Sequence, residues 1–143
     1  MKVVIVYSSR YGNGKKCVDC VDGALKAKGH DVLVLNAPQS DPAHIPPADM
    51  YIFSGAAEAF GLAKGIKDYM KNIPEMNGKR YALINTHGMK KPRALPKMEK
   101  ILSKKGMVKA SEIHFQVGKN AETGNGLPAG FDAQLIQWVA GLN

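Results

Sequence analysis

Short apolar runs alternate with longer stretches of helical periodicity along the chain. The runs predict five strands, at 3–7, 32–35, 50–55, 81–85 and 112–117. The first run, VVIVY, is β-branched or aromatic throughout and therefore predicts a strand buried on both faces. The last run, EIHFQV, alternates apolar and polar residues, which is typical of an edge strand.

Between and after these runs, apolar residues recur every three or four positions, as they do on one face of a helix. This spacing predicts four helices, over 17–27, 62–73, 95–102 and 131–142. The segment 37–49 holds four prolines and predicts an ordered loop. Strands that alternate with helices indicate an α/β fold with a parallel sheet, right-handed crossovers and helices on both faces.

Length and composition fit one ordinary globular domain. The chain has 143 residues, 45% of them hydrophobic and 22% charged, so we expect a single domain over 1–143. No apolar run approaches the roughly 20 residues of a membrane-spanning helix, and no signal peptide is visible. Two cysteines are too few for a disulfide framework. We therefore expect a cytoplasmic protein that binds no membrane.

Basic residues are concentrated in the second part of the chain. Residues 51–143 hold fourteen Lys and Arg against seven Asp and Glu, whereas 1–50 hold six against five. This asymmetry indicates an acidic partner or an anionic ligand, with a solvated lysine-rich surface as the alternative. We do not expect a nucleic-acid partner, because no binding motif is present and few aromatic residues interrupt the basic segment.

The segment between the first strand and the first helix, 8–15, combines several features that favour phosphate binding. It leads into a helix N-terminus, whose free N–H groups and partial positive charge attract anions. Gly12 and Gly14 permit close approach of the backbone, while Ser9, Tyr11 and Asn13 add polar side chains. Neither G-x-x-x-x-G-K-[ST] nor a complete G-x-G-x-x-G is present. The alternative is an ordinary strand-to-helix turn.

The cysteines and histidines predict no metal or dithiol chemistry. Cys17 and Cys20 lie inside the predicted first helix, where a disulfide three residues apart fits poorly, so we expect buried structural thiols. No histidine pair has the spacing of metal ligands. His87 alone falls in a predicted ligand loop, where it either contacts a ligand, supplies a proton, or has no such role.

Three segments together resemble the flavodoxin family. Tyr7 and the residues 9–14 correspond to that family's aromatic-ended first strand and its S-x-T-G-N-T phosphate loop. The segment 53–61 corresponds to a third strand running into G-S-P-T-x-x-G, and 86–89 to the loop after the fourth strand. The resemblance covers nearly the whole chain. The chain lacks the long insertion that splits the fifth strand in long-chain members, so it resembles the short-chain type. It implies a doubly wound five-stranded parallel sheet of order 2-1-3-4-5 with helices on both faces.

The resemblance also implies an FMN site beyond the carboxyl ends of the strands. The phosphate is expected against the first loop, and the ring between the second and third loops. No side chain is expected to be catalytic, because the cofactor carries the chemistry. The expected FMN-binding residues are Ser9, Arg10, Tyr11, Gly12, Asn13, Gly14, Lys15, Ala56, Ala57, Glu58, Ala59, Phe60, Thr86, His87, Gly88 and Met89.

The chain departs from the family pattern at both ends of this site. Gly14 stands where the family has a threonine, and Ala56 and Ala57 stand where it has Pro-Thr. The third loop, commonly acidic in flavodoxins, continues here into basic residues. We expect an acidic redox protein to dock on these residues, which are Lys90, Lys91, Arg93 and Lys97.

The resemblance therefore implies an FMN-binding electron-transfer protein that passes electrons to a protein partner. Two alternatives stay open at this point. One is an FMN-dependent NAD(P)H:quinone-type reductase, and the other is a flavodoxin-like interaction module that binds no cofactor.

Overall fold

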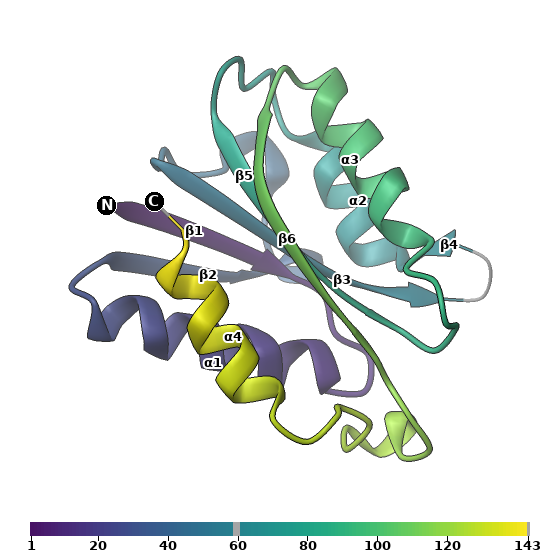
Figure 1. Ribbon diagram of the computed structural model, residues 1–143. Coiled ribbons are helices and arrows are strands. Elements are labelled where there is room, and N and C mark those ends of the chain that lie inside the picture. The colour runs from purple at the N-terminus through teal and green to yellow at the C-terminus, as the bar shows by residue number, and fades with distance from the viewer. Residues whose placement is uncertain (59–60, 143) are drawn as a thin grey trace.

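The sheet has five parallel strands. The computed structural model describes residues 1–58 and 61–142. The sheet order is β2-β1-β3-β5-β6, and a short strand β4 pairs antiparallel with the end of β3 (Figure 1). The order of the parallel strands confirms the predicted 2-1-3-4-5 topology. The strand bounds are β1 Lys2–Tyr7, β2 Asp31–Asn36, β3 Met50–Glu58, β4 Gly61–Leu62, β5 Arg80–His87 and β6 Val108–Gln116.

Two helices cover each face of the sheet. Helices α1 (Asn13–Ala27) and α4 (Phe131–Ala140) lie on one face, and α2 (Lys64–Asn72) and α3 (Ala94–Lys104) lie on the other (Figure 1). Each helix falls on one of the predicted apolar periodicities. None of these helices has both the length and the apolar character to cross a bilayer, among the residues that the structure describes.

The central strand β1 explains why two cores form. Val3 and Ile5 pack with α1 and α4, whereas Val4 and Val6 pack with α2 and α3, and all four are fully buried. Side chains alternate between the two faces of a strand, so an uninterrupted apolar run serves both cores. The expectation of a strand buried on both faces is thus confirmed.

Gly55 allows α2 to pack directly on β3. A Cβ atom at this position would lie 2.5 Å from Cγ2 of Ile66, a side chain that is fully buried on α2. Such a distance is too short for any side chain, so glycine is needed for the helix to reach the sheet. This packing holds the carboxyl end of β3 in place beside the site described below.

Two strands extend further than the apolar runs predict. β3 continues to Glu58 and β5 to His87, because Ala56 pairs with Thr86 in the parallel register. The second and third ligand loops, expected after the strands 50–55 and 81–85, are therefore partly strand. The edge strand β6 begins at Val108, earlier than predicted. The loop 37–49 contains two short 3₁₀ helices, Ala37–Gln39 and Pro42–His44.

Candidate functional site

A cavity of about 240 Å³ opens at the carboxyl ends of the parallel strands. It lies where the strand order reverses, between β1 and β3, which is the usual ligand position in such sheets. Its lining comes from four separate segments of the chain. These residues are Ser9, Arg10, Tyr11, Asn13, Gly14, Ala56, Ala57, Glu58, Thr86, His87, Gly88, Val117, Ala121 and Glu122.

A second cavity of about 280 Å³ adjoins the first. The two share Ala57, His87 and Gly88, and together they reach the 300–1,000 Å³ that is typical of cofactor and ligand pockets. The second cavity is lined on its other sides by Gly61, Met89, Lys91, Arg93 and Ala94.

Most of the residues predicted for the site thus come together around these cavities. Met89 lines only the second cavity, and Gly12 and Lys15 line neither. Ala59 and Phe60 lie outside the residues that the structure describes. Whether any of these residues contacts FMN stays a prediction.

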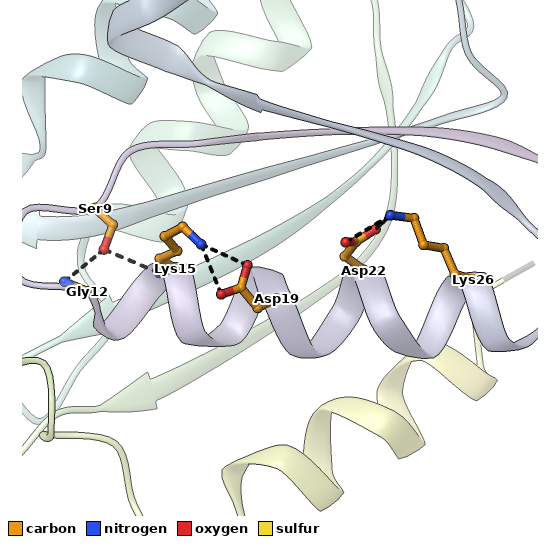
Figure 2. A network of polar contacts seen from close by, with 6 residues as sticks. All are labelled: Ser9, Gly12, Lys15, Asp19, Asp22 and Lys26. Atoms are coloured by element: carbon orange, nitrogen blue, oxygen red, sulfur yellow. Dashed lines mark hydrogen bonds and ion pairs between the residues drawn. The ribbon is translucent and has the colours of Figure 1, made fainter.

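The segment 8–15, which is expected to bind phosphate, is organised around the hydroxyl of Ser9 (Figure 2). It is called the phosphate loop below. Its Oγ accepts hydrogen bonds from the backbone N–H groups of Gly12, at 3.1 Å, and Lys15, at 3.2 Å. Gly12 has a φ of 99°, in the left-handed region that favours glycine. The ammonium of Lys15 lies along α1 and pairs with Asp19 at 3.0 Å, and this hydrogen bond raises the pKa of Lys15 (Figure 2).

The start of α1 leaves backbone donors beside the first cavity. The N-cap residue Gly12 provides no side-chain cap, and the first turn of the helix contains no acidic residue. The N–H groups of Asn13 and Gly14, both buried residues, have no acceptor among the described residues. Buried N–H groups are normally paired, and at a helix N-terminus they favour an anion. The geometry therefore suits the phosphate of a ligand.

The side chain of Asn13 has a different position from the one expected. Its Nδ2 donates to the carbonyl of Ala121 at 2.8 Å, and its Oδ1 accepts from the N–H of Gly126 at 3.0 Å. Asn13 therefore ties the phosphate loop to the segment 117–126, rather than offering its whole amide to a ligand. Gly124 allows the two segments to approach each other, because a Cβ atom at this position would lie only 2.5 Å from the carbonyl oxygen of Tyr11.

Sequence reasoning missed the segment 117–126 as a wall of the site. A signal was available, because the segment directly follows the fifth predicted strand. The carboxyl ends of parallel strands lie along one edge of a sheet, so this loop had to join the other three.

His87 is a strand residue with partners, not a loop residue. Only 2% of it is exposed, and its Nδ1 lies 2.5 Å from the carbonyl oxygen of Met89. Its Nε2 lies 2.9 Å from Nδ1 of His114 on β6. The structure therefore places two histidines together that are far apart in the sequence. In the sequence, the contact between these histidines was indicated only by the prediction that the fourth and fifth strands are neighbours.

Both signs of charge line the cavities. Glu58 and Glu122 are on the wall of the first cavity with Arg10, whose guanidinium carbon lies 5.1 Å from the ring centre of Tyr11. The second cavity has no carboxylate in its lining.

The predicted docking residues lie at the N-terminal end of α3. Lys91 and Arg93 line the second cavity, and the Nζ of Lys97 lies near Gly61. Within the described residues, Lys90, Lys91 and Arg93 form no ion pair. Glu99 and Glu112 line a neighbouring cavity with Lys91 and Arg93, but neither is in an ion pair with them.

The two cysteines are free thiols on α1. Cys17 is fully buried, and its burial raises the thiol pKa to about 12. Cys20 is half-buried, and partial burial also raises its pKa. Raised pKa values are typical of inert thiols, so the expectation of structural cysteines holds for Cys17, while Cys20 is more accessible than expected. No group of three or more His, Cys, Asp or Glu in the described part of the chain is arranged to hold a metal ion.

Comparison with known proteins gives matches in structure but not in sequence. No protein-family model matches the chain, and no curated protein sequence does. The flavodoxin of Streptococcus pneumoniae TIGR4 superposes with a TM-score of 0.80 at 20% identity, covering 99% of this chain and 97% of that one. Two-electron reduced Megasphaera elsdenii flavodoxin superposes with a TM-score of 0.77 at 19% identity, covering 96% of this chain and 98% of that one.

A larger enzyme contains a similar domain. Rubredoxin oxygen:oxidoreductase from Desulfovibrio gigas superposes with a TM-score of 0.79 at 15% identity, covering 99% of this chain but 35% of that one. These identities are low, so the likeness concerns architecture. Together with the strand order and the helices on both faces, the comparisons show that this chain has the flavodoxin fold.

Proposed function

We propose that this protein binds FMN between its first, second and third post-strand loops and transfers electrons to a protein partner. The observation that carries the proposal is the pair of unpaired N–H groups at the start of α1. They lie beside a cavity at the point where the strand order reverses. The flavodoxins with the same fold support the choice of cofactor.

The residues present fit a flavin phosphate. Asn13 and Gly14 offer backbone N–H groups, and Gly12 turns the loop so that these groups face a ligand rather than a side chain. Arg10 adds a positive charge on the cavity wall. A single phosphate loop is present, which favours FMN over a dinucleotide.

The residues present also leave room for the ring. Ala56 and Ala57 on β3 line the cavity together with Thr86 and Gly88 at the end of the neighbouring strand β5, and none of these side chains is large. When bound, FMN supplies stepwise uptake and release of electrons. The task of the chain is then to hold the ring against β3 and β5, to keep water from its buried side, and to leave one edge accessible.

We further propose that the partner is an acidic redox protein that docks on Lys90, Lys91, Arg93 and Lys97. These residues follow the loop after β5, so a partner bound to them is close to the ring edge. A cluster of cations attracts an acidic surface over several ångströms and speeds association at low salt. The formal net charge of +8 also favours a partner with a negatively charged surface.

One observation favours a second function, an FMN-dependent NAD(P)H:quinone-type reductase. The adjoining cavity of about 280 Å³ shares a wall with the candidate ring site and carries Lys91 and Arg93, so a small anionic oxidant would have room there. The Desulfovibrio gigas protein, named as an oxidoreductase, contains the same fold within a longer chain.

The visible spectrum of the purified protein, with and without added FMN, tests the proposal. We expect a yellow protein that releases FMN on denaturation and that is reduced only slowly by NAD(P)H alone. Steady NAD(P)H turnover by the isolated protein would favour the reductase. A colourless protein that ignores micromolar FMN would contradict flavin binding and favour a cofactor-free interaction module.

A further inference from the structure

His87 and His114 form a hydrogen-bonded pair at the boundary of the two cavities. The ring centres are 5.0 Å apart and the planes are inclined by 44°. His87 is almost fully buried and lines both cavities, whereas His114 is exposed on the edge strand β6. The pair therefore connects solvent with the inner wall of the candidate flavin site.

The partners determine where the protons lie. A carbonyl oxygen only accepts, so the Nδ1 of His87 must donate its proton to Met89 across the 2.5 Å contact. When His87 is neutral, its Nε2 is an acceptor, and the Nδ1 of His114 donates to it across 2.9 Å. The Nε2 of His114 then carries the free lone pair, on the exposed ring.

This arrangement has room for one additional proton. A proton that binds Nε2 of His114 leaves every hydrogen bond intact. Transfer of the Nδ1 proton of His114 to Nε2 of His87 then moves the positive charge to the buried ring, and His114 is neutral again. A second proton is opposed, because two N–H groups would point at each other across 2.9 Å and two cations would be adjacent.

We propose that the His87–His114 pair is a one-proton relay, which takes a proton from solvent and carries its charge to the cavity wall when an electron enters the site. The inference rests on the proposed FMN function, whose electron donor supplies the electron. One electron is gained in the cavity and one proton is gained by the imidazole pair. No bond to the ring is formed, and the added charges balance.

The surroundings favour a pair that is neutral until a negative charge appears. Partial burial and the neighbouring His87 hold the pKa of His114 below 6.5, and Glu112 on the same strand opposes them. Lys91 and Arg93 line the second cavity beside His87, and they disfavour a further cation.

The remaining charged groups that line the cavities with His87 are on the first cavity, where Glu58 and Glu122 oppose Arg10. A new negative charge in the cavity favours the charged form of the pair and raises its proton affinity.

The first test is an imidazole ¹⁵N NMR titration of the protein without flavin. We expect the pair to take up one proton as the pH is lowered into the acid range, and to bind no second proton while the protein stays folded. His30 and His44 lie elsewhere, beside the N-terminus and Asp41, and provide internal references in the same spectrum. Independent uptake of two protons by His87 and His114 would overturn the relay.

The second test repeats the titration with FMN bound, before and after reduction with dithionite. We expect reduction to raise the proton affinity of the pair about tenfold, the effect of a unit charge roughly 10 Å away near a protein surface. A yellow protein whose pair titrates at the same pH in both states would overturn the relay alone. Failure to bind FMN would overturn the proposed function as well, so the two failures are distinguishable.

The third test uses His114→Gln, because the glutamine amide can donate to Nε2 of His87 but cannot titrate. Proton uptake on reduction, followed with a pH indicator below about pH 7, should be smaller than in the natural protein by up to one proton. FMN affinity of the oxidised protein should stay within about twofold, since the hydrogen bond is kept. The control His44→Gln should leave the uptake unchanged, and an unchanged uptake in His114→Gln would contradict the relay.

Discussion

The two halves of the candidate site are held by different kinds of contact. In the phosphate half, the backbone around Gly12, the hydroxyl of Ser9 and the amide of Asn13 form a hydrogen-bonded frame. In the ring half, by contrast, the wall includes His87, Lys91 and Arg93, and salt screens the field of its two cations. If FMN binds as proposed, we expect geometry in the first half to decide whether the phosphate binds, and charge in the second half to set the energy of the reduced state.

The largest effect is expected from Gly12→Val, which breaks the frame of the phosphate half. Valine at a φ of 99° is strained by about 1–3 kcal/mol, and the shifted loop would lose one charge-assisted hydrogen bond worth about 1.5–3 kcal/mol. FMN affinity, measured by quenching of FMN fluorescence, should fall about 100-fold.

Gly29→Val is the matched control. Gly29 also has a positive φ, of 85°, but follows the far end of α1 with nothing within 4 Å of an added Cβ. The Gly29→Val protein should lose about as much stability as the Gly12→Val protein but keep its FMN affinity. Unchanged FMN affinity in a folded Gly12→Val protein would mean that the ligand binds elsewhere.

A smaller effect is expected from Asn13→Leu, which separates the phosphate loop from the segment 117–126. The substitution leaves the carbonyl of Ala121 and the N–H of Gly126 without partners, at about 1–3 kcal/mol each where they stay buried. Thermal unfolding should show a loss of about 2–4 kcal/mol, and hydrogen exchange should speed up in 117–126.

Asn125→Ala provides the comparison within the same segment. It removes an exposed hydrogen bond from Lys16, at 2.9 Å, and two long exposed ones to Thr123, at 3.5 Å, so stability should change by less than about 0.5 kcal/mol. Equal losses in the two variants would contradict a special role for the buried amide.

The ring half is probed by reversing the charge of Lys90, Lys91 and Arg93 to glutamate. The more negative one-electron potential of bound FMN should fall by the equivalent of about 1–2 kcal/mol, because the anionic reduced form loses its cationic neighbours. Reoxidation by ferricyanide, an anionic probe, should slow and lose its dependence on salt. Affinity for oxidised FMN should change little.

Reversal of Lys104 and Lys105 to glutamate makes two thirds of that charge change at the other end of α3. If this control moves the potential as far as the triple variant does, net charge rather than position sets the potential. If neither variant moves it, the basic residues are only a solvated surface.

The smallest effect is expected from Gly14→Ser, which restores a hydroxyl where the family has one. An added Cβ would lie 3.6 Å from Oγ of Ser9 and 3.8 Å from Oγ of Ser54, so it fits without displacement. FMN should bind about 2- to 10-fold more tightly, the equivalent of one neutral hydrogen bond of about 0.5–1.5 kcal/mol. Weaker binding would place the phosphate away from this position.

Local sequence patterns were sufficient to predict most of the helices and strands and the α/β class, because each of these elements has its pattern within a few residues. The strand order came from the resemblance to the flavodoxin family. The run at 3–7 needs burial on both faces, and the periodicities at 17–27 and 62–73 each need one buried helix face. The glycine-containing turn into α1 was predictable for the same reason, since its residues are contiguous between one strand and one helix, and phosphate binding there stays a prediction.

Contacts between distant segments could not be predicted in this way. Nothing near Asn13 indicates that its amide bonds Ala121 and Gly126, and nothing near His87 indicates His114. The ends of β3 and β5 were misplaced because small and polar residues there resemble a loop, whereas pairing between neighbouring strands keeps them extended. Such features depend on how neighbouring strands are aligned with each other. This register is fixed only when the whole sheet has formed, so local sequence patterns do not show it.

The bonds of Asn13 also bear on the order in which the molecule is assembled. They join residues 108 and 113 positions apart in the chain. Contacts of such separation form late in folding, because closing the long intervening loop opposes them until other contacts have formed. During synthesis the phosphate loop emerges early, yet its facing wall at 117–126 follows the edge strand. We therefore expect a nascent chain to remain without its cofactor until β6 has joined the sheet.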